Sequence, residues 1–208
     1  MHHQHIAADG FSFIFEKGLQ NLPGTIDHLM KYNPSYISCT YGAGGGNVGA
    51  NREVCQMIKN AGTTPVTHFT VIKNTKEGIK EQLDQYLADG VDHMLALRGD
   101  IPLGETTTCG DFDYATDLVK FVRDTYGDKF EIAVAGSPEG HISCRSLESD
   151  IAVLKQKQDN GADYIMTQLC WDMEQFKYWL DAIRKAGITM PVDVGVMPIL
   201  DPVSYTHL

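Results

Sequence analysis

The chain repeats one local order: a helical segment, a glycine, and then a short run of β-branched or aromatic residues. Four helical segments stop in this way, at Gly62, Gly90, Gly161 and Gly187. A residue without a Cβ is favoured where a left-handed backbone closes a helix, so each glycine predicts a helix C-terminus. The repeating unit is about 30 residues long, the length of a strand, a crossover helix and the turn to the next parallel strand. We therefore expect an α/β fold built on a parallel sheet.

Seven segments have the composition of strands in such a sheet: residues 11–15, 36–40, 65–70, 93–98, 131–135, 164–168 and 192–197. They fit either an open doubly wound sheet or a (β/α)₈ barrel that lacks its last strand. Polar residues at the carboxyl ends of the strands favour the barrel, whose active face lies there. These residues are Thr40, His68, Arg98, Asp100 and Gln168. No linker divides the chain, so residues 1–208 are expected to form one domain.

Two helices have clear signals. Asp172 and Gln175 have the spacing of a capping box. Phe176 and Trp179 follow on one face of that helix, and their spacing makes them core residues rather than a stacking platform for a ligand. A second apolar stripe combines Ile79, Leu83, Tyr86 and Leu87.

Charge and cysteine usage limit the partners of the protein. The net charge of −10, from 17 basic and 27 acidic side chains, opposes attraction to nucleic acid or an anionic membrane surface. No apolar run reaches the ~20 residues that cross a bilayer. Five cysteines without a C-x-x-C pair favour reduced thiols and a cytoplasmic location.

A glycine-rich loop follows the second predicted strand. Gly44, Gly46 and Gly49 match the G-x-G-x-x-G spacing of dinucleotide-binding folds. That fingerprint requires an acidic residue about 20 positions further on, and no acidic residue lies between Glu53 and Glu77. A flexible loop is therefore the better interpretation.

An apolar strand ends in Arg98, Gly99 and Asp100. A carboxylate at this position can tune a bound ring or stabilise a developing cation. The alternative is a structural role, in which Arg98 holds Asp100 in an ion pair. The pattern leaves both open.

A second polar group follows the fifth predicted strand. His141 is followed on the next helix by Asp150, Lys155 and Lys157, and the histidine and lysines could bind a diphosphate, although each taken singly is better explained as a solvated charge. Gln168 could bind the edge of a heterocycle or cap a loop. No residues have the spacing of metal ligands, and neither hydrolytic nor zinc chemistry is expected.

Eight strings in order give the chain a resemblance to the methylenetetrahydrofolate reductase family: residues 40–43 (TYGA), 68–70 (HFT), 96–100 (ALRGD), 114–119 (YATDLV), 138–141 (PEGH), 154–157 (LKQK), 167–168 (TQ) and 195–199 (GVMPI). The resemblance implies a (β/α)₈ barrel that carries FAD. It also implies that NADH or NADPH reduces the flavin, which passes a hydride to 5,10-methylenetetrahydrofolate.

The resemblance also implies a set of site residues. Around the flavin it places Thr40, Tyr41, Ala43, His68, Arg98, Gly99, Asp100, Ala115, His141, Asp150 and Lys157. Gln168 and Asp100 would face the site shared by folate and nicotinamide, with Asp100 favouring the cationic iminium of the opened folate ring. Oligomers are usual in the family, so a homo-oligomer is expected.

The chain departs from the family pattern at three places. Ile14 stands where the family has a catalytic glutamate, which leaves Glu16 as the candidate proton donor, and Ser137 replaces a tyrosine near the flavin. Residues 1–15 form an atypical start. Residues 203–208 read like translated adapter sequence, and the family's eighth strand with its flanking helices has no counterpart, so an incomplete barrel is expected.

The leading hypothesis is a flavin-dependent reductase. The substitution at Ile14 keeps open a non-catalytic flavin- or folate-binding subunit, and a barrel lyase or methyltransferase without flavin is a third reading. The sequence does not choose between NADH, NADPH and electrons from a partner protein.

Overall fold

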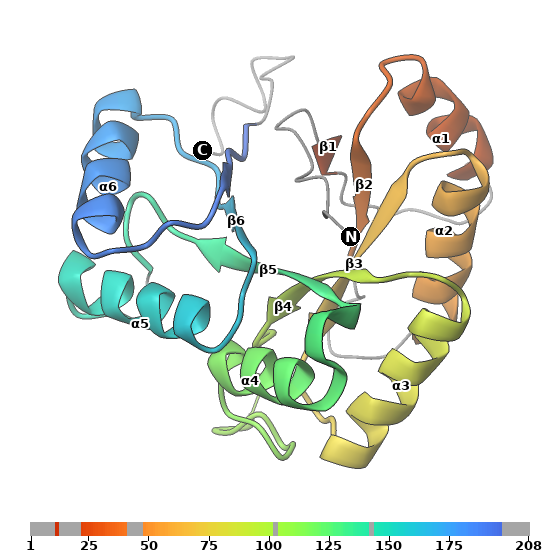
Figure 1. Ribbon diagram of the computed structural model, residues 1–208, viewed down its shortest axis with the longest axis horizontal. Helices are drawn as coiled ribbons and strands as arrows, with labels where there is room; N and C mark the ends of the chain where they lie inside the picture. The colour runs from red at the N-terminus through yellow and green to blue at the C-terminus, as the bar shows by residue number, and fades with distance from the viewer. Residues whose placement is uncertain (1–10, 13–21, 41–47, 102–103, 142–143, 197–208) are drawn as a thin grey trace.

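The computed structural model describes residues 11–12, 22–40, 48–101, 104–141 and 144–196. The strands are β1 (Phe11–Ser12), β2 (Tyr36–Cys39), β3 (Thr64–Thr70), β4 (His93–Leu97), β5 (Glu131–Gly136), β6 (Tyr164–Thr167) and β7 (Val192–Asp193). The helices are α1 (Leu22–Met30), α2 (Val48–Asn60), α3 (Lys76–Ala88), α4 (Ala115–Tyr126), α5 (Leu147–Asp159) and α6 (Met173–Lys185), with a 3₁₀ turn, Gly127–Lys129, after α4. The helices lie outside the strands (Figure 1).

All the strands are parallel, and their order in the sheet is their order in the chain, from β1 to β7. The hydroxyl of Tyr36 on β2 donates to Oδ2 of Asp193 on β7 over 2.9 Å. In a flat sheet, five strand spacings would separate these two strands by roughly 24 Å. The sheet is therefore curled, as Figure 1 shows, and the prediction of a barrel-type α/β fold is confirmed over an open doubly wound sheet.

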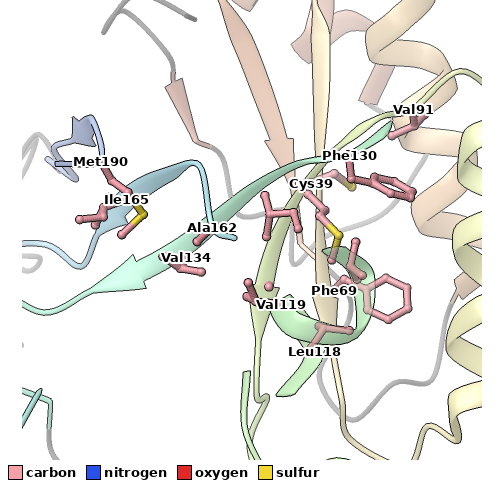
Figure 2. Close-up of a cluster of buried hydrophobic side chains, with 14 of the residues drawn as sticks. Cys39, Phe69, Val91, Leu118, Val119, Phe130, Val134, Ala162, Ile165 and Met190 are labelled. Carbon is pink, nitrogen blue, oxygen red and sulfur yellow. The ribbon is translucent and has the colours of Figure 1, made fainter. Parts of the chain in front are cut away.

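Two apolar layers hold this arrangement. The larger layer lies between sheet and helices, and Figure 2 shows part of it, including Phe69, Val134 and Ile165. The smaller layer lines the inner face of the curled sheet and contains Tyr36, Val66, Leu95, Ala133 and Tyr164. Alternate residues of each strand serve the two layers, because successive side chains of a strand point to opposite faces.

The strand register determines which polar side chains face inward. His68 pairs with Leu95, Leu95 with Ala133, and Ala133 with Tyr164, so the four residues form one row across β3 to β6. Register partners in a parallel sheet point to the same face. The imidazole of His68 therefore lies on the inner face, in the row of the inner apolar layer.

The predicted helix ends are confirmed. Gly62, Gly90, Gly161 and Gly187 all have positive φ angles, between 69° and 104°. The predicted core helices are confirmed too: Trp179 is 1% exposed and its ring contacts Phe176 at a centroid distance of 5.9 Å. No described helix has the length and apolarity to cross a membrane. The five cysteines are free thiols, as expected.

Two sequence predictions are wrong in detail. The last strand was expected over 192–197, yet β7 ends at Asp193 and residues 194–196 lie outside it. Beyond Asp193 the amide of Gly195 donates to the side-chain hydroxyl of Thr167 at 2.9 Å, so side-chain contact replaces the ladder. The capping box of α6 is only half formed. Asp172 caps the helix by accepting from the backbone amides of Glu174 and Gln175, but the side-chain Nε2 of Gln175 donates to the carbonyl of Pro138 at 2.9 Å.

Candidate functional site

The polar residues expected at the active face follow the carboxyl ends of neighbouring strands. Thr40 follows β2, His68 lies near the end of β3, the turn of Arg98, Gly99 and Asp100 follows β4, His141 lies beyond β5, and Gln168 follows β6. Because the strands are parallel and in chain order, these positions share one edge of the curled sheet. We call this edge the mouth. Tyr41, Ala43, Ile14 and Glu16 lie outside the described residues.

The turn after β4 packs directly against the end of β3. Gly99 has a φ of +84°, and a Cβ added there would lie 2.7 Å from Cγ1 of Ile72 and 3.1 Å from Cβ of Thr70. The carbonyl of Arg98 also accepts a hydrogen bond from the amide of Val71 at 3.3 Å. Glycine is thus required by both backbone conformation and space, and it seats Arg98 and Asp100 beside the end of β3.

Asp100 is exposed at the mouth. A purely structural role for this turn, in which Arg98 holds Asp100 in an ion pair, is not supported, because no ion pair joins these two described residues. The guanidinium Nε of Arg98 instead donates to the carbonyl of Gly99 at 3.3 Å. The carboxylate of Asp100 is therefore free to act on a molecule bound at the mouth.

The imidazole of His68 carries a buried Nε2 with no hydrogen-bond partner among the described residues. Burial lowers the pKa of His68 to about 4, so the ring is neutral at physiological pH. A buried polar atom without a partner costs free energy unless a ligand or water satisfies it. The inward position of the ring, one strand from the Arg98 turn, makes it a candidate ligand contact.

His141 and Asp150 meet at the start of α5, and Lys157, in the last turn of α5, extends to the end of β5. The amide of His141 donates to Oδ2 of Asp150 at 3.3 Å, and the Lys157 ammonium donates to the carbonyl of Ala135, near the end of β5, at 3.1 Å. Burial lowers the pKa of Lys157, and the charge of Asp150 opposes that shift. Lys157 thus reaches the strand end and is not a solvated charge on the outer helix face. The imidazole of His141 is exposed.

Gln168 is exposed, and its backbone amide donates to the carbonyl of Gly136 at 2.8 Å. That bond ties the ends of β5 and β6 and holds Gln168 at the mouth without using its side chain. Ala115, by contrast, is 9% exposed in the first turn of α4, and only its methyl group and backbone are available to a ligand.

Sequence reasoning missed two polar contributors. The thiol of Cys144 donates to Oδ1 of Asp150 at 3.6 Å. Asn51, on α2, is 4% exposed and donates to the carbonyls of Cys39 and Thr40. Its signal was present, because Asn51 occupies the first position of the buried helical stripe that continues through Val54 and Ile58. A polar residue on such a stripe requires buried partners.

No group of three or more His, Cys, Asp or Glu side chains among the described residues could hold a metal ion. The chemistry available at the mouth is that of a free carboxylate, a neutral imidazole, a part-buried ammonium and an exposed amide. These groups suit a ligand with both a heterocyclic and an anionic part.

The family model for methylenetetrahydrofolate reductase matches residues 3–207. The chain belongs to the methylenetetrahydrofolate reductase family. A probable methylenetetrahydrofolate reductase (NADH) of Oryza sativa subsp. japonica is 36% identical over 217 residues, which cover 94% of this chain and 36% of the rice protein. The 5,10-methylenetetrahydrofolate reductase of Escherichia coli K12 is 33% identical, covering 86% of this chain and 60% of the bacterial protein. This member of the family thus spans about a third of the plant relative and three fifths of the bacterial one.

Solved structures support the fold alone. Phosphonopyruvate hydrolase with oxalate and Mg²⁺ superposes with a TM-score of 0.62 at 10% identity, covering 87% of this chain and 65% of the hydrolase. 2,3-Dimethylmalate lyase superposes with a TM-score of 0.59 at 13% identity, covering 96% and 72%. At such identities the likeness says nothing of the reaction.

Proposed function

We propose that residues 1–208 form a single barrel domain that binds FAD and reduces 5,10-methylenetetrahydrofolate to 5-methyltetrahydrofolate, with NADH or NADPH as the electron donor. One observation carries the proposal beyond family membership. Of the residues that the resemblance assigns to flavin and folate, Thr40, His68, Arg98, Gly99, Asp100, His141 and Gln168 lie at or beyond the carboxyl ends of β2 to β6, on one edge of the sheet. Barrel enzymes build their active sites on that edge.

The described residues fit FAD. The neutral imidazole of His68 offers a buried nitrogen without a partner in the described part of the chain, which suits the polar edge of a heterocycle. Lys157 and His141 offer cationic or hydrogen-bonding groups near the end of β5, where the phosphate or ribose oxygens of FAD would be held. FAD, when bound, supplies hydride transfer in two half-reactions, from the nicotinamide and then to the folate.

Asp100 and Gln168 are proposed to act on the substrate. The carboxylate of Asp100 is exposed and has no ion-pair partner among the described residues, so its charge is available to favour the cationic iminium of the opened folate ring. The amide of Gln168 can donate to and accept from a heterocycle edge while its backbone stays fixed to Gly136. Glu16 remains the candidate proton donor to the folate nitrogen.

One sequence feature favours a second function. Isoleucine at position 14 cannot donate a proton where the family has glutamate. A flavin- or folate-binding protein without reductase activity is therefore the alternative to the enzyme.

Spectroscopy separates the two functions. We expect the purified protein to bind FAD with a flavin absorbance band, to bleach when NADH or NADPH is added without oxygen, and to recover its colour with 5,10-methylenetetrahydrofolate. A band that bleaches or recovers with neither partner supports the binding protein. Failure of the folded protein to bind FAD would reject the reductase and the flavin-binding protein, and would leave only the folate-binding form of the alternative.

A further inference from the structure

The side chain of Asn51 forms a saturated hydrogen-bond centre between α2, β2, β3 and α3. Its Nδ2 donates to the carbonyl of Thr40 at 2.9 Å and to the carbonyl of Cys39 at 3.3 Å. Its Oδ1 accepts from the hydroxyl of Tyr86 at 2.7 Å and from the hydroxyl of Thr67 at 2.9 Å. The carboxamide thus uses both its donors and both lone pairs of its oxygen.

The two ends of this carboxamide face different parts of the protein. Tyr86 and Thr67 belong to the scaffold: Tyr86 is a fully buried residue of α3, and Thr67 is a fully buried residue inside β3. Cys39 is the last residue of β2, and Thr40 follows it at the mouth. Asn51 therefore links the buried residues of α3 and β3 to the end of β2 through hydrogen bonds.

Among the described residues, no strand pairing reaches the carbonyl of Thr40. Register pairing between β2 and β3 ends with Cys39 opposite Thr67. Beyond that point Asn51 provides the donor that a neighbouring strand would otherwise supply. Aspartate would lose this donor and oppose two carbonyl dipoles with a negative charge, while an aliphatic residue would remove all four of these hydrogen bonds.

We propose that Asn51 is a positioning residue for the cofactor site: its amide sets the carbonyl of Thr40, and hence the direction in which the chain leaves β2 at the mouth. The inference rests on the proposed function, in which Thr40 contacts the flavin. Asn51 is buried and acts on the ligand only through Thr40.

The test compares variants that disturb opposite ends of the same amide. Asn51→Asp keeps the acceptors of Tyr86 and Thr67 and removes the donors to β2. Tyr86→Phe removes one bond on the scaffold side and leaves the donors untouched. The measurements are the dissociation constant for FAD, by flavin fluorescence quenching, the thermal midpoint without FAD, and hydrogen exchange of the peptide that contains residues 36–40.

We expect both variants to lower the thermal midpoint. Only Asn51→Asp is expected to weaken FAD binding, at least tenfold, and to speed exchange in residues 36–40, while Tyr86→Phe changes the dissociation constant less than twofold. Equal FAD affinity of the two variants would overturn the inference. Should Asn51→Asp not fold, Asn51→Ser replaces it, because a shorter hydroxyl cannot reach both carbonyls, and the same comparison decides.

The same measurements distinguish a failure of this inference from a failure of the proposed function. If the unmodified, folded protein binds no FAD, the proposed function fails, and the exchange measurement alone still tests whether Asn51 orders the end of β2. If the unmodified protein binds FAD and Asn51→Asp binds it equally well, only the role of Asn51 is rejected.

Discussion

The two ends of the barrel differ in whether their polar side chains have partners within the protein. At the amino ends of the strands, which we call the floor, charged groups are paired: His93 lies between Asp92 and Glu131, at 2.7 and 3.1 Å, and Arg123 binds Asp163 at 2.7 Å. At the mouth, Asp100 and Gln168 are exposed, and Nε2 of His68 has no partner within the described ranges. We infer from this difference that the charged groups of the floor stabilise the fold, whereas the polar groups of the mouth are available to a ligand.

Arg123 gives the strongest test of the floor. Its guanidinium donates to the carbonyls of Gly161 and Gly127 at 2.7 Å each, in addition to Asp163. Arg123→Met removes these bonds and leaves Asp163, whose pKa burial already raises, without its cation. We expect the free energy of unfolding to fall by about 3 kcal/mol, measured by urea denaturation, with the FAD affinity of the folded protein unchanged.

Lys120→Met is the matched control on the same helix. Lys120 pairs with Asp124 at 2.9 Å, and both side chains are 62% exposed. An exposed pair of this kind contributes within about 0.5 kcal/mol. An equal loss in both variants would contradict the distinction between the floor and the outer surface.

Asp100 gives the corresponding test of the mouth. Asp100→Asn removes the charge that favours a cationic substrate intermediate but no described ion pair. We expect the rate of flavin reoxidation by 5,10-methylenetetrahydrofolate to fall about 100-fold, or about 2.7 kcal/mol, and stability to change by less than about 0.5 kcal/mol. Asp124→Asn, on the outer face of α4, is the control. A variant that loses stability and keeps its rate would assign Asp100 to structure.

The pH dependence of stability sharpens the view of the floor. Burial lowers the pKa of His93, but the carboxylates of Asp92 and Glu131 outweigh it and raise the pKa to about 9. A raised histidine pKa stabilises the fold fully below the unfolded value of roughly 6.5. The stabilisation is then lost as pH rises through 9.

We expect the difference in unfolding free energy between the unmodified protein and His93→Gln to be largest at acidic to neutral pH. It should shrink by about 1 kcal/mol between pH 6.5 and 10. Urea denaturation across this range measures it. A difference that stays constant with pH would show that His93 is neutral in the folded protein.

The features of the fold that could be predicted from the sequence are those that nearby residues determine, such as helix ends and strands. Gly62 and Gly161 end helices because the backbone needs a positive φ there, and strands β2 to β6 and most core stripes could be placed by pattern, whereas β7 is shorter than its pattern indicated. The curl of the sheet was indicated only indirectly, by polar residues at the strand ends and by the family resemblance, because the contact that shows it joins Tyr36 and Asp193, 157 residues apart. The same holds for Gln175, whose side chain leaves its own helix cap for the distant carbonyl of Pro138.

The candidate site divides in the same way. Asp100 and Gln168 could be selected because a polar residue ending an apolar strand is visible in sequence. Lys157 could not be distinguished from a solvated helix charge, since only the fold shows that its ammonium reaches the carbonyl of Ala135. Asn51 gave a usable signal, a polar residue on a buried stripe, but its partners on β2, β3 and α3 are set by tertiary packing.

The smallest predicted effect compares the two buried side-chain atoms that lack partners among the described residues, Nε2 of His68 and the hydroxyl of Tyr164. They lie in one register row, with His68 toward the end of β3 and Tyr164 at the start of β6. Removing a buried polar atom without a partner relieves its desolvation cost, so Tyr164→Phe and His68→Leu should each raise the unfolding free energy by about 0.5 to 1 kcal/mol without FAD.

Only His68→Leu should then weaken FAD binding, about tenfold, because the nitrogen at the mouth is available to the ligand and the hydroxyl in the inner layer is not. Flavin titration of both variants beside their denaturation curves measures this, and a loss of FAD affinity in Tyr164→Phe as large as in His68→Leu would erase the distinction between mouth and floor.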